Sequence, residues 1–431
     1  MREFTLRKLI VATFLVFSVQ CVMAQADVDS PYSMFGIGQV RNKTMNTRLG
    51  GMGGVANALW NGSMINAENP ASYATFDSLA FLFDVGLYAK SSTFSTTQLS
   101  EKSSNASLNY VALGFGVTPW WKTAFGAQPY SSVGYNIVVN HHDDMIGNYG
   151  TAFRGNGGLN QTFWGNAFRL GKLFSVGANA TFVFGDSESL TTLYFPDSTY
   201  RLATRRGVDL MVRSFMFDYG MLYRTELGDN MNFSLGLTYN QKIKIGGRQT
   251  TFIRTIIGNA GLNEVEHVVD TIFYKKQADG SLTLPHGVGF GVALQKNNRW
   301  TVGADFNWSQ WKGFERNGIA DTTLQNAWSV ACGAEYLPVS SAISNYWSRV
   351  SYRFGGFYEQ TFLRINGQSI NKFGVTMGMS LPLARSLSKV HLGLEFGQCG
   401  TKSDRLIQER YINFTVGVSV HERWFMKRRY Q

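Results

Sequence analysis

Three stretches of this 431-residue chain carry residue types whose spacing could support chemistry. His141-His142-Asp143-Asp144 combines imidazole and carboxylate groups, which are competent metal ligands, although its polar surroundings favour a solvated turn. Residues 165–172 resemble a phosphate-binding loop, but the loop is one residue too long and Leu173 stands where Ser or Thr would bind magnesium. Gly287, Gly289 and Gly291 alternate as in a strand with glycine on one face, whereas a dinucleotide fingerprint requires a following helix.

The remaining sequence does not supply an enzyme signature. It contains no HExxH and no GxSxG motif, and its six histidines are scattered. No acid–base or nucleophile constellation recurs on one face of the elements described below. We therefore expect no enzymatic activity, no cofactor and no metal ion.

The beginning of the chain has the pattern of a secretory signal peptide. Arg2, Arg7 and Lys8 precede an apolar run over residues 9–19, and Val22-Met23-Ala24 offers small residues at a cleavage site. The apolar run is too short to span a membrane. We predict a signal peptide over residues 1–24 and an exported mature chain.

The composition indicates an outer-membrane β-barrel. Charged residues make up 16% of the chain, below the ~25% of soluble proteins, while aromatics reach 14% and glycines number 46. No later segment has eighteen consecutive apolar residues, so no membrane helix is expected. An exported chain with these properties fits a multi-pass bacterial barrel. We assign the net charge of +11 to contact with outer-membrane lipid and lipopolysaccharide, and expect no nucleic-acid partner.

From residue 78 onward, large apolar residues alternate with small or polar ones, which is the period of a β-strand. Phe81, Phe83 and Val85 alternate in this way, and the same pattern recurs to the end of the chain. Large residues facing lipid and small polar residues facing the lumen are typical of a membrane barrel. The pattern places Cys332 on the lipid face and Cys399 on the lumen face, so we expect no disulfide.

The connections predict the topology. Six short turns alternate with seven longer loops, among them 141–160, 185–200 and 246–285, which gives about fourteen antiparallel strands with both ends on the short-turn side. We therefore predict an all-β fold: a fourteen-stranded transmembrane barrel over residues 78–421 and a periplasmic tail over 422–431. Trp120 and Trp121 at one rim, and Trp308 and Trp311 at the other, are interpreted as interfacial aromatic girdles.

Residues 50–71 cannot form a strand core, because glycine weakens strands and proline lacks the ladder donor. We predict that residues 25–77 form a plug inside the barrel, with residues 30–76 starting at its inner mouth. The candidate plug or gate residues are Gly50, Gly51, Gly53, Gly54, Asn66, Asn69, Pro70 and Ala71.

Several charged residues fall on the lumen face of the predicted strands. They are Asp84, Asp218, Arg224, Asp305, Glu335, Arg353, Glu359, His391 and Glu395. Charges inside a narrow barrel must be paired or hydrated. Arg41, Lys43 and Arg48 of the plug are natural partners, so we favour a plug held by ion pairs and hydrogen bonds. The alternative is a polar gate on a ligand path.

The glycine-rich run over residues 50–58, followed by Asn66-Ala67-Glu68-Asn69-Pro70-Ala71, resembles the N-terminal hatch of the FadL-type outer-membrane transporters of hydrophobic compounds. Residues 30–38 and 424–428 look like the branch found in Bacteroidota. The resemblance implies short hatch helices and a kinked third strand that leaves a lateral opening in the wall. Gln128-Pro129 lies where that kink is expected.

Two functions from different classes follow. The first is passive uptake of hydrophobic, fatty-acid-like small molecules through the plugged barrel, with exit sideways into the membrane. The alternative is a barrel that serves as a subunit or shuttle in an outer-membrane protein secretion or assembly complex, similar to the PorV shuttle of the type IX secretion system. The apolar residues within 246–285 could bind either a hydrophobic ligand or a protein.

Overall fold

The computed structural model describes residues 30–40, 46–77, 79–197, 202–228, 230–257, 267–297, 299–339, 345–383 and 386–423. The predicted signal peptide, Arg41, Lys43 and residues 424–431 lie outside these ranges. The strands of the wall are β2 (Ala80–Ser95), β3 (Ser100–Gly116), β4 (Trp121–Asp143), β5 (Gly147–Leu170), β6 (Phe174–Tyr194), β7 (Ala203–Glu226), β8 (Met231–Asn240), β9 (Ile243–Ile257), β10 (His267–Leu284), β11 (Gly287–Lys296), β12 (Trp300–Ser309), β15 (Ala327–Tyr336), β16 (Ser351–Ile365), β17 (Gln368–Pro382), β18 (Lys389–Cys399) and β19 (Gln408–Arg423).

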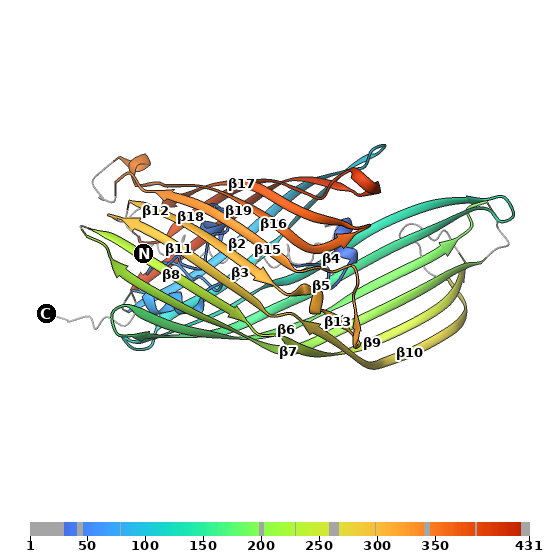
Figure 1. Ribbon diagram of the computed structural model, residues 1–431, viewed down its shortest axis with the longest axis horizontal. Helices are drawn as coiled ribbons and strands as arrows, with labels where there is room; N and C mark the ends of the chain where they lie inside the picture. Colours follow the sequence, from blue (N-terminus) through green and yellow to red (C-terminus); the bar gives the residue numbers. More distant parts are fainter. Residues whose placement is uncertain are drawn as a thin grey trace, which may run out of the picture.

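These strands form a closed antiparallel barrel (Figure 1), because β19 pairs with β2 from Arg423↔Ala80 to Gln408↔Ser95. β7 pairs with both β8 and β9, which together make one crossing of the wall. β10 and β11 likewise make one crossing, interrupted at Pro285, which has no donor for the ladder. With these two pairs counted once each, the wall has the predicted fourteen strands.

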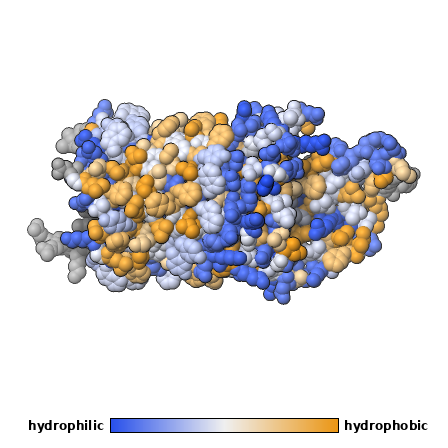
Figure 2. All heavy atoms as spheres, in the orientation of Figure 1, coloured by the Kyte–Doolittle hydropathy of each residue, from blue (hydrophilic) through white to orange (hydrophobic). Residues whose placement is uncertain are grey.

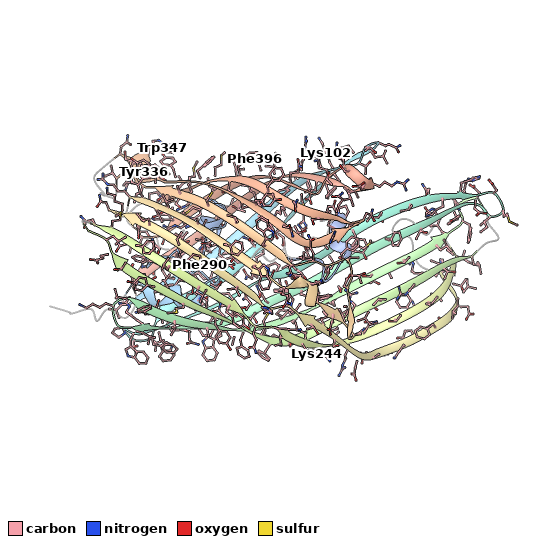
Figure 3. All side chains as sticks on the ribbon, viewed as in Figure 1. Lys102, Lys244, Phe290, Tyr336, Trp347 and Phe396 are labelled. Carbon is pink, nitrogen blue, oxygen red and sulfur yellow. The ribbon has the colours of Figure 1, made fainter. Side chains whose placement is uncertain are left out.

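Large apolar side chains cover one half of the outer surface. Figure 2 shows them gathered over this half, bordered by a band of hydrophilic residues. In Figure 3, Phe290 and Phe396 lie within the apolar half, whereas Lys102 and Lys244 lie farther along the molecule. Phe354 is 61% exposed and Phe215 60%, which is favourable in lipid and costly in water. We call this surface the belt. Its alternation with small inward residues is the pattern that the sequence predicted.

β4 to β7, β9 and β10 continue well beyond the belt as a curved sheet, the outer extension (Figure 1). The prediction of long loops over 141–160, 185–200 and 246–285 is therefore wrong for most of these residues, which lie in strands. Outside the membrane neither face of a strand must be apolar, so the two-residue period that marks the belt strands weakens there.

The wall separates between β3 and β4. Their pairing ends at Val111↔Ala127, just before Gln128-Pro129, and the register of β4 against β5 shifts between Pro129 and Ser131. Beyond this point β1 (Gln39–Val40) pairs with β4 instead, opposite Ser132 and Ser131. The part of β3 from Ser100 to Tyr110 therefore does not pair with β4.

The belt-distal end of the lumen is filled by an apolar group, which we call the outer cluster. It joins buried side chains of the N-terminal residues, of the β12–β15 connection and of the other long-loop ends: Tyr32, Ile37, Trp311, Phe314, Leu324, Leu363, Ile370 and Leu406. Trp311 is 7% exposed and stacks on Phe362 at 4.4 Å between ring centroids. Its assignment to a girdle is therefore wrong, because the ring packs inside the protein.

Residues 30–40 also belong to this outer end. Burial raises the pKa of the Tyr32 phenol well above its ordinary value, and the hydroxyl donates to the carbonyl of Ile407 at 2.5 Å. Arg316 Nη2 donates to the carbonyl of Gly36. The prediction that residues 30–76 start at the inner mouth is thus wrong for 30–40, because apolar side chains such as Ile37 find their buried partners in the outer cluster.

No described helix has the length and apolar character needed to cross a membrane.

Candidate functional site: the barrel interior

Residues 46–77, the inner segment, follow the inner wall of the barrel from strand to strand. Thr47 lies against β18 and β19, Met52 against β15 and β16, and Asn57 against β8 and β11. Pro70 lies against β6, and Phe76 against β3. At each of these places the wall residue is glycine, and an added Cβ would clash with the inner segment: Gly417, Gly333, Gly355, Gly236, Gly291, Gly177 and Gly114. The inward glycines therefore let the inner segment approach the wall closely, with its backbone at most of these places and with the side chains of Phe76 and Thr47 at Gly114 and Gly417.

Asparagines organise the inner segment locally. Asn46 caps α2 (Thr47–Gly50) by accepting from the N–H of Arg48 at 2.8 Å, and Asn69 caps η2 (Pro70–Thr75) by accepting from Ala71 at 3.1 Å. Asn69 also donates to the carbonyls of Asn57 at 2.6 Å and of Met221 in β7 at 3.1 Å. Asn66 donates to the carbonyl of Ala56 at 2.7 Å. These amides fix a segment that has little regular structure of its own.

A buried ion cluster joins the inner segment to β15 and β16. Arg48 grips Glu335 through two bonds, Nη2 to Oε1 at 2.6 Å and Nε to Oε2 at 2.9 Å. Arg353 reaches the same carboxylate at 2.5 Å, so Glu335 serves two guanidinium groups. Arg353 is 4% exposed and Glu335 7%. A carboxylate shared in this way keeps both cations satisfied in a desolvated site.

The cluster continues across the next strands as a chain of hydrogen bonds. Arg353 donates to Ser380 of β17 at 2.7 Å, Ser380 contacts His391 Nδ1, and His391 Nε2 lies 2.8 Å from Ser419. Ser419 in turn bonds Asp84 of β2. Every donor in this order finds an acceptor when Nε2 of the imidazole carries the hydrogen.

Asp84 connects this series of hydrogen bonds to the inner segment. Its carboxylate accepts from Asn46 at 2.6 Å and from the Tyr110 hydroxyl at 2.8 Å. The structure thus brings four of the predicted lumen charges into one polar network, which we call the seat: Asp84, Glu335, Arg353 and His391. Two residues at the start of the inner segment join this network: Asn46 bonds to Asp84, and Arg48 bonds to Glu335.

Asp305 of β12 holds the middle of the inner segment. One oxygen, Oδ2, accepts from the backbone N–H groups of Ala56 at 2.6 Å and Asn57 at 2.8 Å. The residue is 4% exposed. A carboxylate that accepts from two adjacent N–H groups positions the backbone at Ala56 and Asn57.

We expect Asp305→Ala to lower the free energy of unfolding by about 2–3 kcal/mol, because two buried N–H groups lose a charged acceptor. Urea titration of the folded barrel in detergent, followed by tryptophan fluorescence, measures the change. Asp144→Ala is the control, since that side chain is fully exposed and a change within about 0.5 kcal/mol is expected. Equal stability of the two variants would show that Asp305 does not hold the segment.

The other predicted lumen charges lie apart from the seat. Asp218 accepts from Asn240, Arg224 lies 4.6 Å from the ring of Trp60, and Glu395 accepts from Tyr411 at 2.7 Å. Glu359 lies on β16 and faces a cavity. The sequence did not single out Asn46, Asn57 or Tyr110. For Asn46 a signal was present, because an Asn before a helical turn is a common N-cap; the inward position of Tyr110 carried none.

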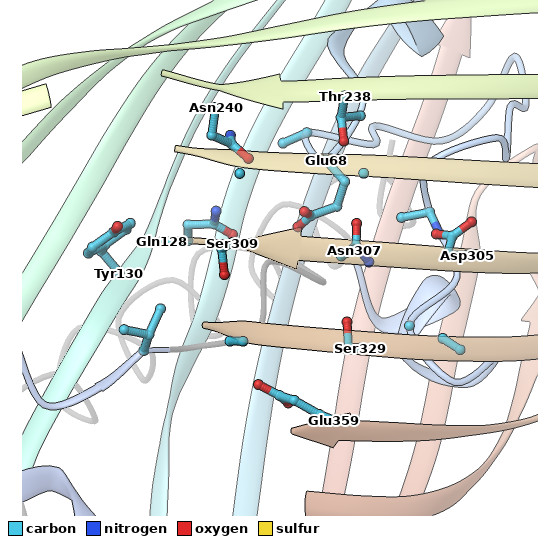
Figure 4. A pocket seen from close by; sticks show the side chains of 18 of the residues that line it. Glu68, Gln128, Tyr130, Thr238, Asn240, Asp305, Asn307, Ser309, Ser329 and Glu359 are labelled. Atoms are coloured by element: carbon cyan, nitrogen blue, oxygen red, sulfur yellow. The ribbon is translucent and has the colours of Figure 1, made fainter. Parts of the chain in front are cut away.

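A cavity of about 430 Å³ lies beside the inner segment, and Trp311 of the outer cluster borders it. Its lining is mixed: it includes the polar side chains of Glu68, Gln128, Asn240, Asp305, Asn307 and Glu359 (Figure 4) and the apolar side chains of Phe163, Met216, Leu284, Phe357 and Phe362. Lys90 and Lys372 also line it, but acids outnumber them. Pockets for hydrophobic ligands are lined predominantly by apolar side chains. The space left in this lumen has a mixed lining instead, in which charged and amide groups lie beside aromatic and aliphatic side chains.

The remaining candidate motifs from the sequence are a turn, two cysteine thiols and a glycine-containing strand. At the end of β4, Asp143 accepts from the N–H groups of Met145 and Ile146, and His142 pairs with Asn148 at 2.7 Å, as in a solvated turn. The described residues contain no group of three metal-ligating side chains. Cys332 is exposed and Cys399 buried, and both are free thiols. Residues 287–291 lie in strand β11, with Gly289 and Gly291 against Asn57.

A family model described as BamG matches residues 5–431. The chain belongs to the BamG family. No curated protein matches it. Among solved structures, the Pseudomonas putida toluene transporter TodX is similar with a TM-score of 0.58 and 17% identity over 91% of this chain and 100% of that chain. A Pseudomonas aeruginosa FadL homologue has a TM-score of 0.58 and 13% identity over 90% and 100%.

The Ralstonia pickettii toluene transporter TbuX gives a TM-score of 0.57 and 13% identity over 88% of this BamG-family chain and 98% of that chain. The resemblance to the FadL type is thus confirmed for the fold, and the chain is a multi-pass outer-membrane β-barrel. TodX and TbuX are named as toluene transporters. At such low identity they establish the shared architecture, and function must be argued from the interior of this barrel.

Proposed function

We propose that this BamG-family barrel acts as a subunit of an outer-membrane protein secretion or assembly complex, and that its lumen does not conduct small molecules. The observation that carries the proposal is the inner segment, which is tightly bonded to the wall of the barrel. The inner segment is bonded to strands around the wall, from the seat to Asp305 and Asn69. It serves as a fixed internal brace.

Energetics support a fixed segment. Opening the lumen would separate Arg48 from Glu335 and leave the buried carboxylate with Arg353 as its one remaining guanidinium partner. Breaking one partner of a buried pair costs about 3–5 kcal/mol. Asp305 and the glycine contacts add to this cost, because the inner segment fits its wall backbone to backbone. A passive gate, which has no energy source, would have to be loosely held.

The second candidate is passive uptake of hydrophobic small molecules with lateral exit. It is favoured by the separation of β3 from β4, since Asn109 of β3 and Gln128 and Pro129 of β4 line the cavity. However, β3 beyond the separation reads SEKSSNASLN, a polar sequence. A hydrophobic ligand that left the lumen through this separation would meet polar side chains at the outer border of the belt.

The two candidates are separated by isolation from native membranes in mild detergent. The subunit function predicts a stoichiometric partner that stays bound through gel filtration, while an unrelated barrel from the same membranes, treated identically, lacks it. Proteoliposomes of the purified chain should take up a fluorescent fatty acid no faster than empty vesicles. A solitary barrel that accelerates this uptake would overturn the subunit proposal and establish the channel.

A further inference from the structure

The outer extension ends in a free sheet edge on β10. Among the described residues, β10 pairs with β9 along its whole length, but its other edge is paired only at Leu282 and Thr283, with β13 (Glu315–Arg316). Asn317 bonds to Ser281 and ends this contact. From His267 to Gly280, the second edge therefore presents backbone donors and acceptors that no described strand pairs with.

The same stretch carries exposed apolar side chains, which we call the ridge: Val268, Val269, Ile272, Phe273 and Tyr274. They are 46%, 50%, 62%, 45% and 52% exposed, respectively. Five exposed apolar side chains of this size on one short stretch are uncommon in contact with water, and such clusters mark interaction sites.

Lipid does not cover the ridge. Ile272 and the belt residue Val288 lie on the same crossing of the wall, in β10 and β11. At ~3.3 Å per residue and a tilt of ~40°, Ile272 stands about 35–40 Å above Val288, more than the ~25 Å height of an apolar band. An apolar surface at this height is therefore suited to contact with a protein partner.

The edge already accepts a strand from its own chain. The short hairpin of β13 and β14 (Ile319–Ala320) adds to β10 at Leu282 and Thr283. A further extended segment could continue this addition toward His267 and bury the ridge side chains. Strand addition supplies affinity through the backbone and specificity through the side chains.

A second copy of the same edge is a poor occupant. The register of β10 against β9 shifts between Val268 and Asp270, between Thr271 and Phe273, and between Lys275 and Ala278. Each shift is a bulge, and bulges interrupt the regular ladder that two identical edges would share. The occupant must instead be shaped to this irregular edge, which points to a different protein.

We propose that the ridge is the docking surface for a protein partner, which lays an extended segment with apolar side chains along β10 beyond Ser281. The inference rests on the proposed subunit function and names the surface that this function would use. The partner's segment replaces the missing neighbour of β10 and shields the ridge from water.

Site-specific photo-cross-linking in living cells tests this docking. A photoreactive phenylalanine analogue at Ile272 or Tyr274 should give a cross-link to one protein, identified by mass spectrometry as the stoichiometric partner. The same analogue at Leu193 of β6, which is 38% exposed on the outer extension and paired on both sides with β5 and β7, should give none. Ile272→Asp and Phe273→Asp should lower co-isolation of that partner at least tenfold, while Leu193→Asp leaves it unchanged; unheated gel mobility confirms that each barrel is folded.

Each outcome decides a separate question. Wild-type protein that carries a partner which the ridge variants retain would overturn the docking surface and leave the subunit function standing. A wild-type barrel that is isolated alone would overturn the subunit function itself. A cross-link between two copies of this chain, or adducts to lipid only, would also reject a protein partner at the ridge.

Discussion

Glu335→Ala is expected to destabilise the barrel by about 3–5 kcal/mol, the cost of leaving a buried charge without its partner. The substitution removes the carboxylate that serves both Arg48 and Arg353. Arg353 is 4% exposed, so water reaches it poorly. The loss should appear as a lower urea midpoint of the folded barrel and a lower temperature at which its compact form is lost on unheated gels.

Two variants control for this effect. Glu226→Ala removes an exposed carboxylate at the end of β7 and should change stability by less than about 0.5 kcal/mol. Arg48→Ala leaves the Glu335–Arg353 pair in place and should cost less than Glu335→Ala. If all three variants unfold at the same urea concentration, the ion cluster does not stabilise the inner segment.

Gly53→Ala is expected to displace the inner segment from its wall. Gly53 has a φ of +73°, which disfavours a side chain, and an added Cβ would meet the carbonyl oxygens of Gly356 at 2.7 Å and Cys332 at 2.8 Å. These are backbone atoms of β16 and β15 and cannot swing away. We expect a loss of about 3 kcal/mol, from strain at this φ together with overpacking. Protease sensitivity of the segment and single-channel conductance of the purified barrel should rise.

Gly50→Ala is the matched control three residues away. Gly50 ends α2, and a Cβ there has nothing within 4 Å. Alanine is the better helix former, so this variant should be neutral or more stable by up to about 1 kcal/mol. A Gly53→Ala barrel with the stability and conductance of Gly50→Ala would refute the close fit of the segment.

Much of the fold could be predicted from the sequence, because the membrane imposes a strict rule on it. In the belt every strand must face lipid on one side, so large apolar side chains occupy every second position of a strand. Phe290, Phe354 and Phe414 are such side chains on three different strands. Alternating turns then fixed the strand number, and the inward position of Asp84, Glu335, Arg353 and His391 followed from the same alternation. The glycine-rich run and Asn66-Ala67-Glu68-Asn69-Pro70-Ala71 indicated the family type for the same reason: only such residues can turn and pack closely against a wall.

The tertiary structure decided what lies outside this rule. Beyond the belt no lipid enforces alternation, so the long strands of the outer extension and the free edge of β10 were invisible. The outer cluster unites Tyr32, Trp311 and Leu406, which are far apart in the chain and meet only through the closed wall. That Glu335 serves two arginines, and that the remaining cavity has a mixed lining, likewise depends on side chains from several strands that face one another across the lumen. The sequence alone determined the barrel and its inner segment, and long-range packing determined how firmly that segment is held.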